Sequence, residues 1–180
     1  MPTTDRLGAA RRILVYGVTG SGKTTLAARL AGVTGICWYS VDDLTWEPGW
    51  VQVPDGEQRR RIEAICAGEE WILDTAYGKW RDVPLARAQV VVALDYSRLF
   101  SLQRLLRRTV GRVLDRRAVC NGNRETLRQA MSRDSIIAWH FASFSRKRAR
   151  IRSWCAAVDS PPVLRFSSRR QCRGWFEAPR

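Results

Sequence analysis

Gly17-Val18-Thr19-Gly20-Ser21-Gly22-Lys23-Thr24 is a complete match to the phosphate-binding pattern G-x-x-x-x-G-K-[ST]. The β-compatible residues Ile13-Leu14-Val15-Tyr16 come just before it, and the helix-forming run Leu26-Ala27-Ala28-Arg29-Leu30 comes just after. A strand, a glycine turn and a helix are the context this motif requires, because backbone N–H groups and a helix N-terminus then face phosphate oxygens. The alternative is a chance glycine turn, and the flanking residues on both sides argue against it. The stretch predicts a P-loop in an α/β fold.

Each residue type in this loop suits a bound nucleoside triphosphate. Lys23 can reach the β- and γ-phosphates, and the Thr24 hydroxyl can ligate Mg²⁺. The predicted cofactors are therefore ATP and Mg²⁺. The residues expected to bind the nucleotide through this loop are Gly17, Gly20, Ser21, Gly22, Lys23, Thr24 and Thr25.

Length, charge and cysteine usage limit the class of protein. The 180 residues are expected to form one domain, 1–180, with an ordinary globular core. The 31 basic and 17 acidic side chains give a net charge of +14, which favours anionic partners such as nucleotides, nucleic acid or a membrane surface. Five widely spaced cysteines without a C-x-x-C pair indicate reduced thiols rather than a zinc site. With no signal peptide and no membrane-spanning run, a cytoplasmic protein is expected.

Two acidic residues follow the next predicted strand. Residues 36–41 are β-rich and largely apolar, as in a buried parallel strand, and Asp42-Asp43 end it. Ligands of open α/β sheets bind beyond the carboxyl ends of strands, so these carboxylates are candidates for a substrate hydroxyl or a metal. The alternative is a solvated turn or a helix N-cap.

Several side chains in the loops that follow are candidate acceptor contacts. Trp46 and Trp50 flank a Pro48-Gly49 turn and must pack either on the protein or on a flat ligand. Asp74 ends the apolar strand Trp71-Ile72-Leu73 and is a Walker B candidate for Mg²⁺. Tyr77 and Arg81 lie in the loop after it.

The remaining pattern alternates strands with helices. The expected strands are 89–95, whose apolar run suits the centre of a parallel sheet, and 163–166. The expected helices are 55–67, 84–87, 98–112, a long helical segment after residue 124 and 169–176. This order predicts a three-layer α/β sandwich.

The helix expected over 98–112 has two unlike faces. One arc carries apolar residues, namely Leu99, Leu102, Leu105, Leu106 and Val113. The opposite arc carries Arg104, Arg108 and Arg112 at intervals of four residues. Stacked like charges indicate either a solvated face or a polyphosphate ligand, which arginines bind by paired hydrogen bonds.

Most of the excess charge lies in one segment. Residues 98–152 contain 15 basic and three acidic side chains, a net charge of +12. Residues 111–133, with the turn Asn121-Gly122-Asn123, are expected to form a basic lid. In the helix after Asp134, Ile137, Phe141, Phe144, Ile151, Cys155 and Val158 are expected to share the buried face. Arg148 falls on that face and either snorkels or reaches a site, whereas Arg146, Lys147, Arg150 and Arg152 are expected to be solvated.

With these residues in view, the whole chain resembles the small P-loop kinases of the nucleoside-monophosphate kinase type. It is most similar to the adenylate-kinase-related topology-modulation (FlaR-like) proteins, through the P-loop, 42–50, 71–74, Leu94-Asp95, Arg104 with Arg108, and 121–125. The P-loop is specific only to the superfamily, whereas Asp-Asp-Leu-x-Trp-x-Pro-Gly-Trp at 42–50 is specific to the small group.

The resemblance implies a five-stranded parallel sheet in the order 2-3-1-4-5. It implies that Asp74 is the family's acidic residue after the third strand, that Arg104 covers the adenine, and that Arg108 contacts the phosphates. It makes Arg124 and Arg133 further lid candidates. The group usually has Gly-Asn-Tyr after the aspartate, whereas this chain has Thr75-Ala76-Tyr77, a departure on the substrate side.

Together these features predict an ATP- and Mg²⁺-dependent phosphotransferase acting on a small molecule, with nucleosides and nucleotides among the candidates. Lys23, Asp42 and Arg108 are the expected catalytic residues. The expected acceptor contacts are Asp42, Asp43, Trp46, Trp50, Tyr77, Arg81, Arg124 and Arg133. The alternatives are a nucleic-acid-binding P-loop ATPase or regulator, which the +12 segment would suit, and a protein that binds ATP without turnover.

Overall fold

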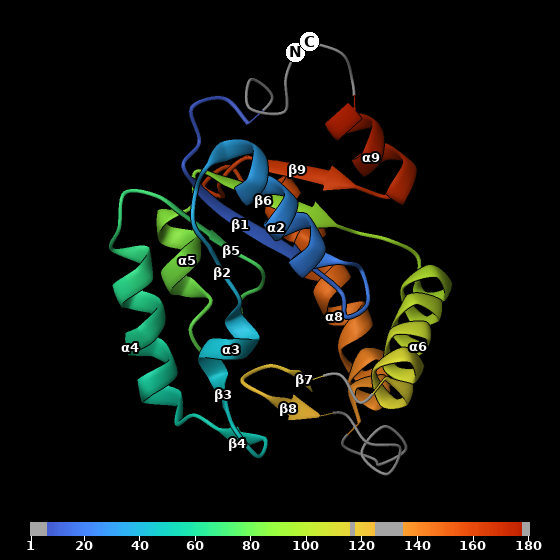
Figure 1. Cartoon of the computed structure of the whole chain (residues 1–180). Helices are drawn as coiled ribbons and strands as arrows, with labels where there is room; N and C mark the ends of the chain where they lie inside the picture. The colour runs from blue at the N-terminus through green and yellow to red at the C-terminus, as the bar shows by residue number, and fades with distance from the viewer. Residues whose placement is uncertain (1–6, 116–117, 125–134, 178–180) are drawn as a thin grey trace.

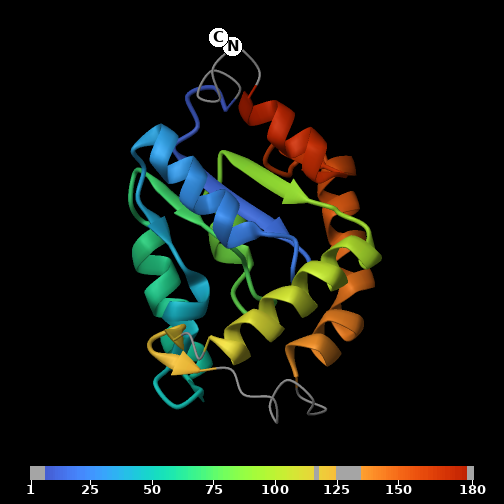
Figure 2. The same cartoon turned by 45° about the vertical axis from the view of Figure 1, so that its right-hand side comes forward.

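The computed structural model describes residues 7–115, 118–124 and 135–177. A five-stranded parallel sheet forms its centre, and helices cover both faces (Figures 1 and 2). The strands of this sheet are β1 (Arg12–Gly17), β2 (Trp38–Tyr39), β5 (Trp71–Leu73), β6 (Val90–Leu94) and β9 (Val163–Phe166). They lie in the order β2-β5-β1-β6-β9. Counted among themselves along the chain, this is 2-3-1-4-5, as predicted.

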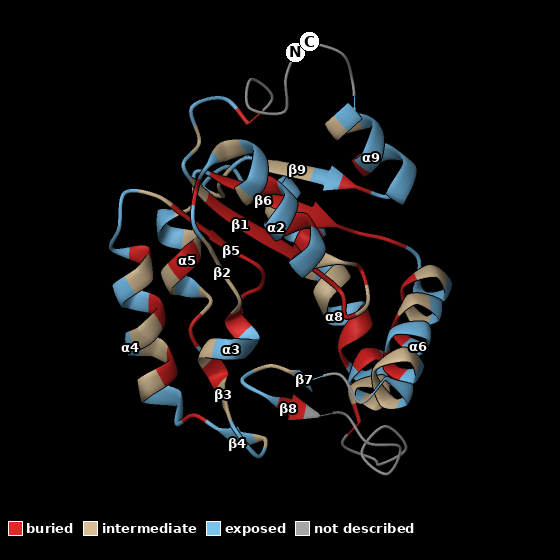
Figure 3. Ribbon diagram, viewed as in Figure 1, coloured by how far each residue is buried: buried red, intermediate tan, exposed pale blue. Residues whose placement is uncertain are grey.

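Alternation along β1 explains why both faces of the sheet are buried. Ile13 and Val15 point to the face covered by α2 (Lys23–Thr34) and α9 (Arg169–Glu177). Leu14 and Tyr16 point to the opposite face, covered by α4 (Asp55–Cys66), α5 (Asp82–Arg87) and α8 (Ile136–Ala156). Apart from Arg12 at the start of β1, the central strands are buried (Figure 3), which confirms the three-layer α/β sandwich.

The second strand is much shorter than its sequence suggests. Only Trp38–Tyr39 pair with the sheet, at its edge, and both residues are half-buried. Ser40 then caps a short helix, α3 (Val41–Thr45), by accepting a hydrogen bond from the Asp43 backbone N–H at 3.4 Å. A side-chain acceptor before two acidic residues favours a helix N-terminus over continued strand. The prediction of a buried strand over 36–41 was therefore wrong in extent and burial.

Two small hairpins complete the side of the molecule where the parallel strands end. One is formed by β3 (Trp46–Glu47) and β4 (Val51–Gln52), which enclose the predicted Pro48-Gly49 turn. The other is formed by β7 (Ala118–Val119) and β8 (Asn123–Arg124) around the predicted Asn121-Gly122 turn. Figure 1 shows the two hairpins side by side, below the carboxyl ends of the sheet strands.

Helix α6 (Arg98–Leu114) buries only part of its predicted leucine arc. Leu99 and Leu106 are 67% and 41% exposed, whereas Ser101, Leu105 and Thr109 form the buried face. The helix faces the P-loop: a β-carbon on Gly20 would lie 2.3 Å from the Ser101 carbonyl oxygen. A periodic pattern shows where the apolar residues of a helix lie, but not which part of the protein the helix packs against. Here α6 packs against the P-loop.

The inner face of α8 also differs from the prediction. His140, Ser143, Phe144 and Ile151 are buried, whereas Phe141, Cys155 and Val158 are exposed. The helix is therefore rotated relative to its apolar pattern. This rotation lets two polar side chains of the helix reach their partners: His140 lies near the Thr19 carbonyl, and Arg148 pairs with the buried Asp95.

Candidate active site

The P-loop joins β1 to α2 in the geometry that its glycines permit. Gly20 and Gly22 have positive φ angles of 81° and 96°, which side chains disfavour. Gly17 has no such angle, but a β-carbon there would lie 2.7 Å from the Leu94 carbonyl oxygen. Ser21 is buried, and its hydroxyl donates to the Val18 carbonyl at 2.8 Å. Thr25 is exposed in the first turn of α2.

Lys23 lies where two carboxylates and one arginine act on its ammonium group. Its Nζ donates to the Val18 carbonyl at 3.2 Å. Burial lowers the pKa of Lys23, the charges of Asp74 and then Asp42 oppose that shift, and the charge of Arg108 adds to it. The charges of Asp74, Asp42 and Arg108 therefore all act on the ammonium group of Lys23.

Asp74 connects the P-loop helix to the segment that follows β2. One carboxylate oxygen accepts from the Thr24 hydroxyl at 2.7 Å, and the other accepts from the Val41 backbone N–H at 3.0 Å. Burial raises the pKa of Asp74, while the hydrogen bonds from Thr24 and Val41 oppose that rise. A hydroxyl and a carboxylate beside a phosphate-binding loop are the hard oxygen ligands that Mg²⁺ prefers, so these residues fit the ion.

Asp42 lies in the first turn of α3, on the other side of this bridge. The Tyr77 hydroxyl donates to its Oδ1 at 2.5 Å. Burial, together with the charge of Asp42, raises the pKa of Tyr77 well above its ordinary value, so this phenol stays protonated. Both Asp42 and Asp43 are exposed, which leaves the carboxylate of Asp42 open to a ligand. Both aspartates lie in the first turn of α3, whose N-cap is Ser40, so neither of them is the N-cap itself. The Tyr77 hydroxyl gives Asp42 a fixed hydrogen-bond partner.

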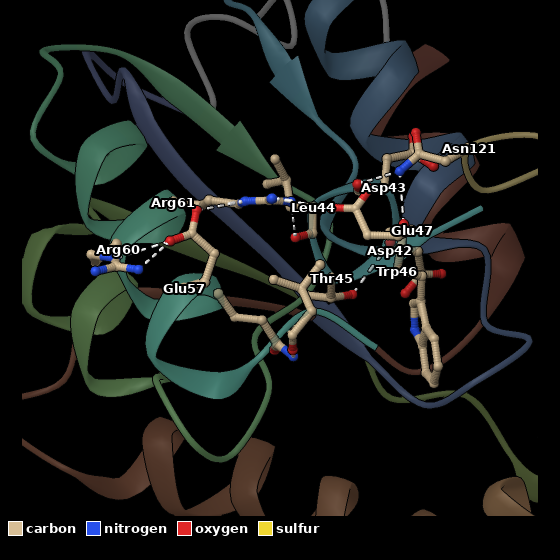
Figure 4. Close-up of polar contacts among 12 residues, drawn as sticks. Asp42, Asp43, Leu44, Thr45, Trp46, Glu47, Glu57, Arg60, Arg61 and Asn121 are labelled. Atoms are coloured by element: carbon tan, nitrogen blue, oxygen red, sulfur yellow. Dashed lines mark hydrogen bonds and ion pairs between the residues drawn. The ribbon is translucent and has the colours of Figure 1, made fainter. Parts of the chain in front are cut away.

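The α3–β3 segment is held on two sides, as Figure 4 shows. Arg61 of α4 donates to the Leu44 carbonyl at 3.1 Å and pairs with Glu47 at 3.1 Å and with Glu57. On the other side the Asn121 amide donates to the Asp43 and Trp46 carbonyls at 2.7 and 2.8 Å. Neither anchor was identified from the sequence, because Asn121 was interpreted only as a turn residue.

The β7–β8 hairpin makes further hydrogen bonds to the β3–β4 hairpin. The Asn123 amide donates to the Glu47 carbonyl at 3.0 Å, and its Oδ1 accepts from the Trp50 backbone N–H at 2.9 Å. Cys120 donates from Sγ to the Asp42 carbonyl at 3.1 Å. Trp46 and Trp50 pack edge to face with ring centroids 6.0 Å apart, so each tryptophan has the other as one partner.

Two of the predicted arginines of α6 face the nucleotide side. The Arg104 guanidinium lies beside Gly22: a β-carbon there would be 2.9 Å from its Nη2. Arg108, one turn further along, acts on Lys23 through its charge. Arg108 is nevertheless exposed and Arg104 and Arg112 are half-buried, so the polyphosphate interpretation of this row stays a prediction.

Helix α8 contributes polar residues that sequence reasoning missed. The His140 Nδ1 lies 3.1 Å from the Thr19 carbonyl of the P-loop, and burial lowers the pKa of this ring. Lys147 and Arg150 were expected to be solvated, but both are half-buried, and Arg150 donates to the Tyr16 hydroxyl at 3.1 Å. Their spacing from His140 and Ser143 on one helical face was the signal that could have located them.

Arg148 has a structural partner rather than a place in the site. Its Nε donates to the fully buried Asp95 carboxylate at 2.5 Å, and Arg165 of β9 binds the same carboxylate at 2.5 Å. Among the remaining candidates, Arg81 lies just before α5 and is half-buried. Arg124 forms part of β8 through its backbone, and Arg133 lies outside the described residues.

No protein-family model matches the chain, and no curated protein matches it by sequence. Solved structures do match it. A sugar kinase from Janibacter sp. HTCC2649 is 18% identical, with 93% of this chain and 90% of that chain covered at a TM-score of 0.51. A shikimate kinase from Bacteroides thetaiotaomicron is 15% identical, with 93% and 95% covered at a TM-score of 0.55. The chain therefore has the P-loop α/β fold of small-molecule kinases.

Proposed function

We propose that this protein transfers the γ-phosphoryl group of Mg-ATP to a hydroxyl of a small molecule. The observation that carries the proposal is the shared neighbourhood of Lys23, Asp74 and Asp42. Asp74 joins Thr24 to Val41, the residue before Asp42 at the start of α3. This contact supports the proposal, because a phosphotransferase has to hold the metal-bound phosphates and the acceptor hydroxyl close together.

Each residue has a defined part in this transfer. The P-loop amides and Lys23 bind the phosphates. Thr24 and Asp74 would hold Mg²⁺, which would neutralise charge on the phosphate oxygens. Asp42, oriented by Tyr77, accepts the proton of the acceptor hydroxyl. The acceptor oxygen forms a bond to the γ-phosphorus as the bond to the β-phosphate oxygen breaks, which gives ADP and a phosphorylated acceptor. Arg104 and Arg108 stabilise charge on the transferred group.

We extend the proposal to the finer resemblance. The chain is assigned to the adenylate-kinase-related group of topology-modulation proteins, as one domain whose 111–133 segment closes over the acceptor as a lid. The contacts of Asn121 and Asn123 with the α3–β4 region support a closing role, because they join this segment to the acceptor side. Arg124 and Arg133 would reach the ligand from that lid. The five free cysteines suit a reducing cytoplasm, and none of the described helices could cross a membrane.

Substitutions at Asp42 and Asp74 give the sharpest test, because each should impair a different part of the reaction. A screen with labelled ATP against nucleosides, nucleotides and small alcohols identifies an acceptor. Asp42→Asn should then keep Mg-ATP affinity and lose about 10²–10⁴-fold in transfer, as expected on removing a general base. Asp74→Asn should impair Mg²⁺-dependent turnover with every acceptor, water included, and Lys23→Ala should abolish tight ATP binding in a folded protein.

Asp159→Asn is the matched control, because Asp159 is exposed beyond the end of α8. It should transfer phosphate at the wild-type rate. Wild-type transfer by Asp42→Asn would contradict the role of Asp42, and unchanged ATP affinity in folded Lys23→Ala would contradict the role of the loop. ATP binding without transfer to any acceptor would favour the alternative of a nucleotide-binding protein without turnover.

A further inference from the structure

A histidine of α8 contacts the P-loop from behind. His140 is the only histidine in the sequence, and its side chain has no exposed surface. Its Nδ1 lies 3.1 Å from the carbonyl oxygen of Thr19, a buried residue of the P-loop. The two residues are 121 positions apart in the chain, so this contact joins two distant elements at the phosphate-binding loop.

The contact determines which ring nitrogen of His140 carries the proton. A carbonyl oxygen only accepts hydrogen bonds, so Nδ1 must be protonated for the pair to form. The other ring nitrogen, Nε2, is buried and has no hydrogen-bond partner among the described residues. Burial lowers the pKa of His140, the hydrogen bond with Thr19 opposes that shift, and the charges of Arg98 and Lys147 add to it. The ring is therefore neutral near pH 7 and donates through Nδ1.

The Thr19 carbonyl belongs to a peptide group whose other end faces away from α8. In a planar trans peptide, the C=O of Thr19 and the N–H of Gly20 point in opposite directions. A hydrogen bond to the carbonyl oxygen therefore also fixes the direction of the Gly20 N–H. Within the described residues this N–H donates to no protein oxygen, so it can donate to a phosphate oxygen.

Gly20 needs such support because its own backbone is weakly restrained. It lacks a side chain and has a φ angle of 81°, a conformation that glycine enters and leaves easily. On the side of α6, a β-carbon on Gly20 would collide with the Ser101 carbonyl oxygen. On the side of α8, His140 is the one hydrogen-bond donor to the Thr19 carbonyl among the described residues. Both helices therefore restrict the Thr19–Gly20 peptide.

We propose that His140 is a positioning residue of the phosphate-binding loop, whose Nδ1–H holds the Thr19 carbonyl so that the Gly20 N–H faces the bound phosphates. This inference rests on the proposed function, because it concerns how the loop binds ATP. Without the donor, the Thr19–Gly20 peptide would rotate more freely, and the loop would have to be ordered when the phosphates bind. A histidine that only fills the core would need no donor at Nδ1.

The position of the proton can be measured in the wild-type protein. Because the chain has a single histidine, isotope-labelled histidine gives one pair of ring nitrogen signals in a long-range proton–nitrogen NMR spectrum. We expect Nδ1 to carry the proton and Nε2 to be bare near neutral pH. A ring protonated at Nε2 alone would overturn the proposal, because such a ring cannot donate to Thr19.

Two variants separate the hydrogen bond from the volume of the ring. His140→Leu fills the buried site but has no donor, so its affinity for inorganic pyrophosphate and for Mg-ATP should fall roughly three- to ten-fold. His140→Asn fills the site less well but places an amide N–H near the position of Nδ1, so it should retain more affinity. A purely structural role predicts the reverse order, because leucine is the better core residue. Calorimetry measures the affinities, and thermal unfolding shows that each variant is folded.

Ser143→Ala is the matched control. Ser143 is buried one turn further along α8, and its hydroxyl has no hydrogen-bond partner among the described residues. This variant should bind pyrophosphate and Mg-ATP as the wild type does.

The proposal is overturned if His140→Leu binds as tightly as His140→Asn or more tightly, or if Ser143→Ala loses as much affinity as His140→Leu. If neither His140 variant folds, the NMR measurement on the wild type decides. Failure of the proposed function has a different signature. In that case the two His140 variants differ in affinity as expected, but the wild-type protein transfers phosphate to no acceptor.

Discussion

Asp95 directly follows β6 and has a fully buried carboxylate that binds two arginines from different elements. Arg148 comes from α8 and Arg165 from β9, with side chains 28% and 40% exposed. The aspartate therefore ties the helix that carries Lys147 and Arg150 to the edge of the sheet. Its contribution is one of stability and position, since no part of the proposed transfer uses it.

We expect Asp95→Asn to destabilise the protein by about 3 kcal/mol, because two partly buried guanidinium groups lose their counter-charge. For a chain of this size, each kcal/mol corresponds to about 2–4 °C in Tm. Thermal unfolding measures the change, with Asp159→Asn as the exposed control. A variant with the wild-type Tm would show that the arginines are adequately hydrated without Asp95.

Lys147 predicts a pH dependence of stability with a definite sign. Burial, followed by the charge of Lys23, lowers its pKa from the ordinary 10.5 to about 7; Arg150 and Arg146 act in the same direction and Asp42 opposes them. Between these two values the unfolded chain binds the proton that the folded chain has lost, so the contribution of Lys147 to stability rises with pH through this window. Below about pH 7 the cost of burying the ammonium group is fully present.

Lys147→Met should therefore raise Tm by a few degrees at pH 6, and its advantage over wild type should shrink as the pH rises through 7–10. Lys79→Met, at an exposed lysine, should show no comparable pH-dependent gain. A Lys147→Met protein no more stable than wild type at pH 6 would contradict the desolvation of this lysine.

At the scale of elements, the two hairpins depend on each other. The side chains of Asn121 and Asn123 donate to carbonyls of α3 and β3, and Trp50 donates back to Asn123. The backbone on both sides has left-handed residues, with positive φ at Trp50, Cys120 and Asn121. Such conformations persist only where the surroundings hold them, and here each hairpin supplies the other's surroundings.

We expect the double variant Asn121→Ala/Asn123→Ala to open both hairpins more often. Each lost hydrogen bond contributes about 0.5–1.5 kcal/mol, so amide protection at 46–52 and 118–124 should fall roughly 10–100-fold. Hydrogen exchange measures this, and the amides of α2 serve as the internal reference. Gln52→Ala, which removes an exposed amide side chain from β4, should leave protection unchanged. Loss of protection in only one hairpin would show that the two are not coupled.

Some of these elements could be predicted from the sequence and others could not. The P-loop, the apolar strand at 89–95 and the turns at Pro48-Gly49 and Asn121-Gly122 were located correctly, because local backbone chemistry specifies each of them. The faces of α6 and α8 were assigned correctly only in part: Leu105, Phe144 and Ile151 are buried as predicted, whereas Leu99, Leu106 and Phe141 are exposed. In both helices the buried face also carries polar residues, Ser101 and Thr109 in α6 and His140 and Ser143 in α8, which an apolar pattern does not locate.

At the scale of the whole molecule, the +14 charge raises the alternative of nucleic-acid binding. Several of the cations in the basic segment have other roles: Arg104 lies at the P-loop, Arg148 binds Asp95, and Arg150 binds Tyr16. The charge therefore serves the interior as well as the surface, and the case for a nucleic-acid interface is weaker than the count of arginines suggests.

We expect only non-specific DNA binding, with a Kd of about 10⁻⁴–10⁻⁶ M at physiological salt. This affinity should fall steeply as the salt concentration rises, because less free energy is then gained when binding releases counterions from the DNA. ATP should not change it. Fluorescence anisotropy of labelled duplex and single-stranded DNA across a salt series, with and without Mg-ATP, measures both properties. Tight binding at physiological salt that ATP switches would instead favour the regulator.

The sequence by itself determined the P-loop, the order of strands and helices, and the carboxylates that follow two of the strands. These depend on residues close together in the chain, where φ preferences, alternation and capping act directly. Only the tertiary structure decided that Asp74 joins Thr24 to Val41, that Asn121 holds the α3–β3 segment, and that Lys147 and Arg150 are half-buried on α8. Those relations join residues far apart in the chain, and the packing of α8 against β1 determines which side of the helix meets the site.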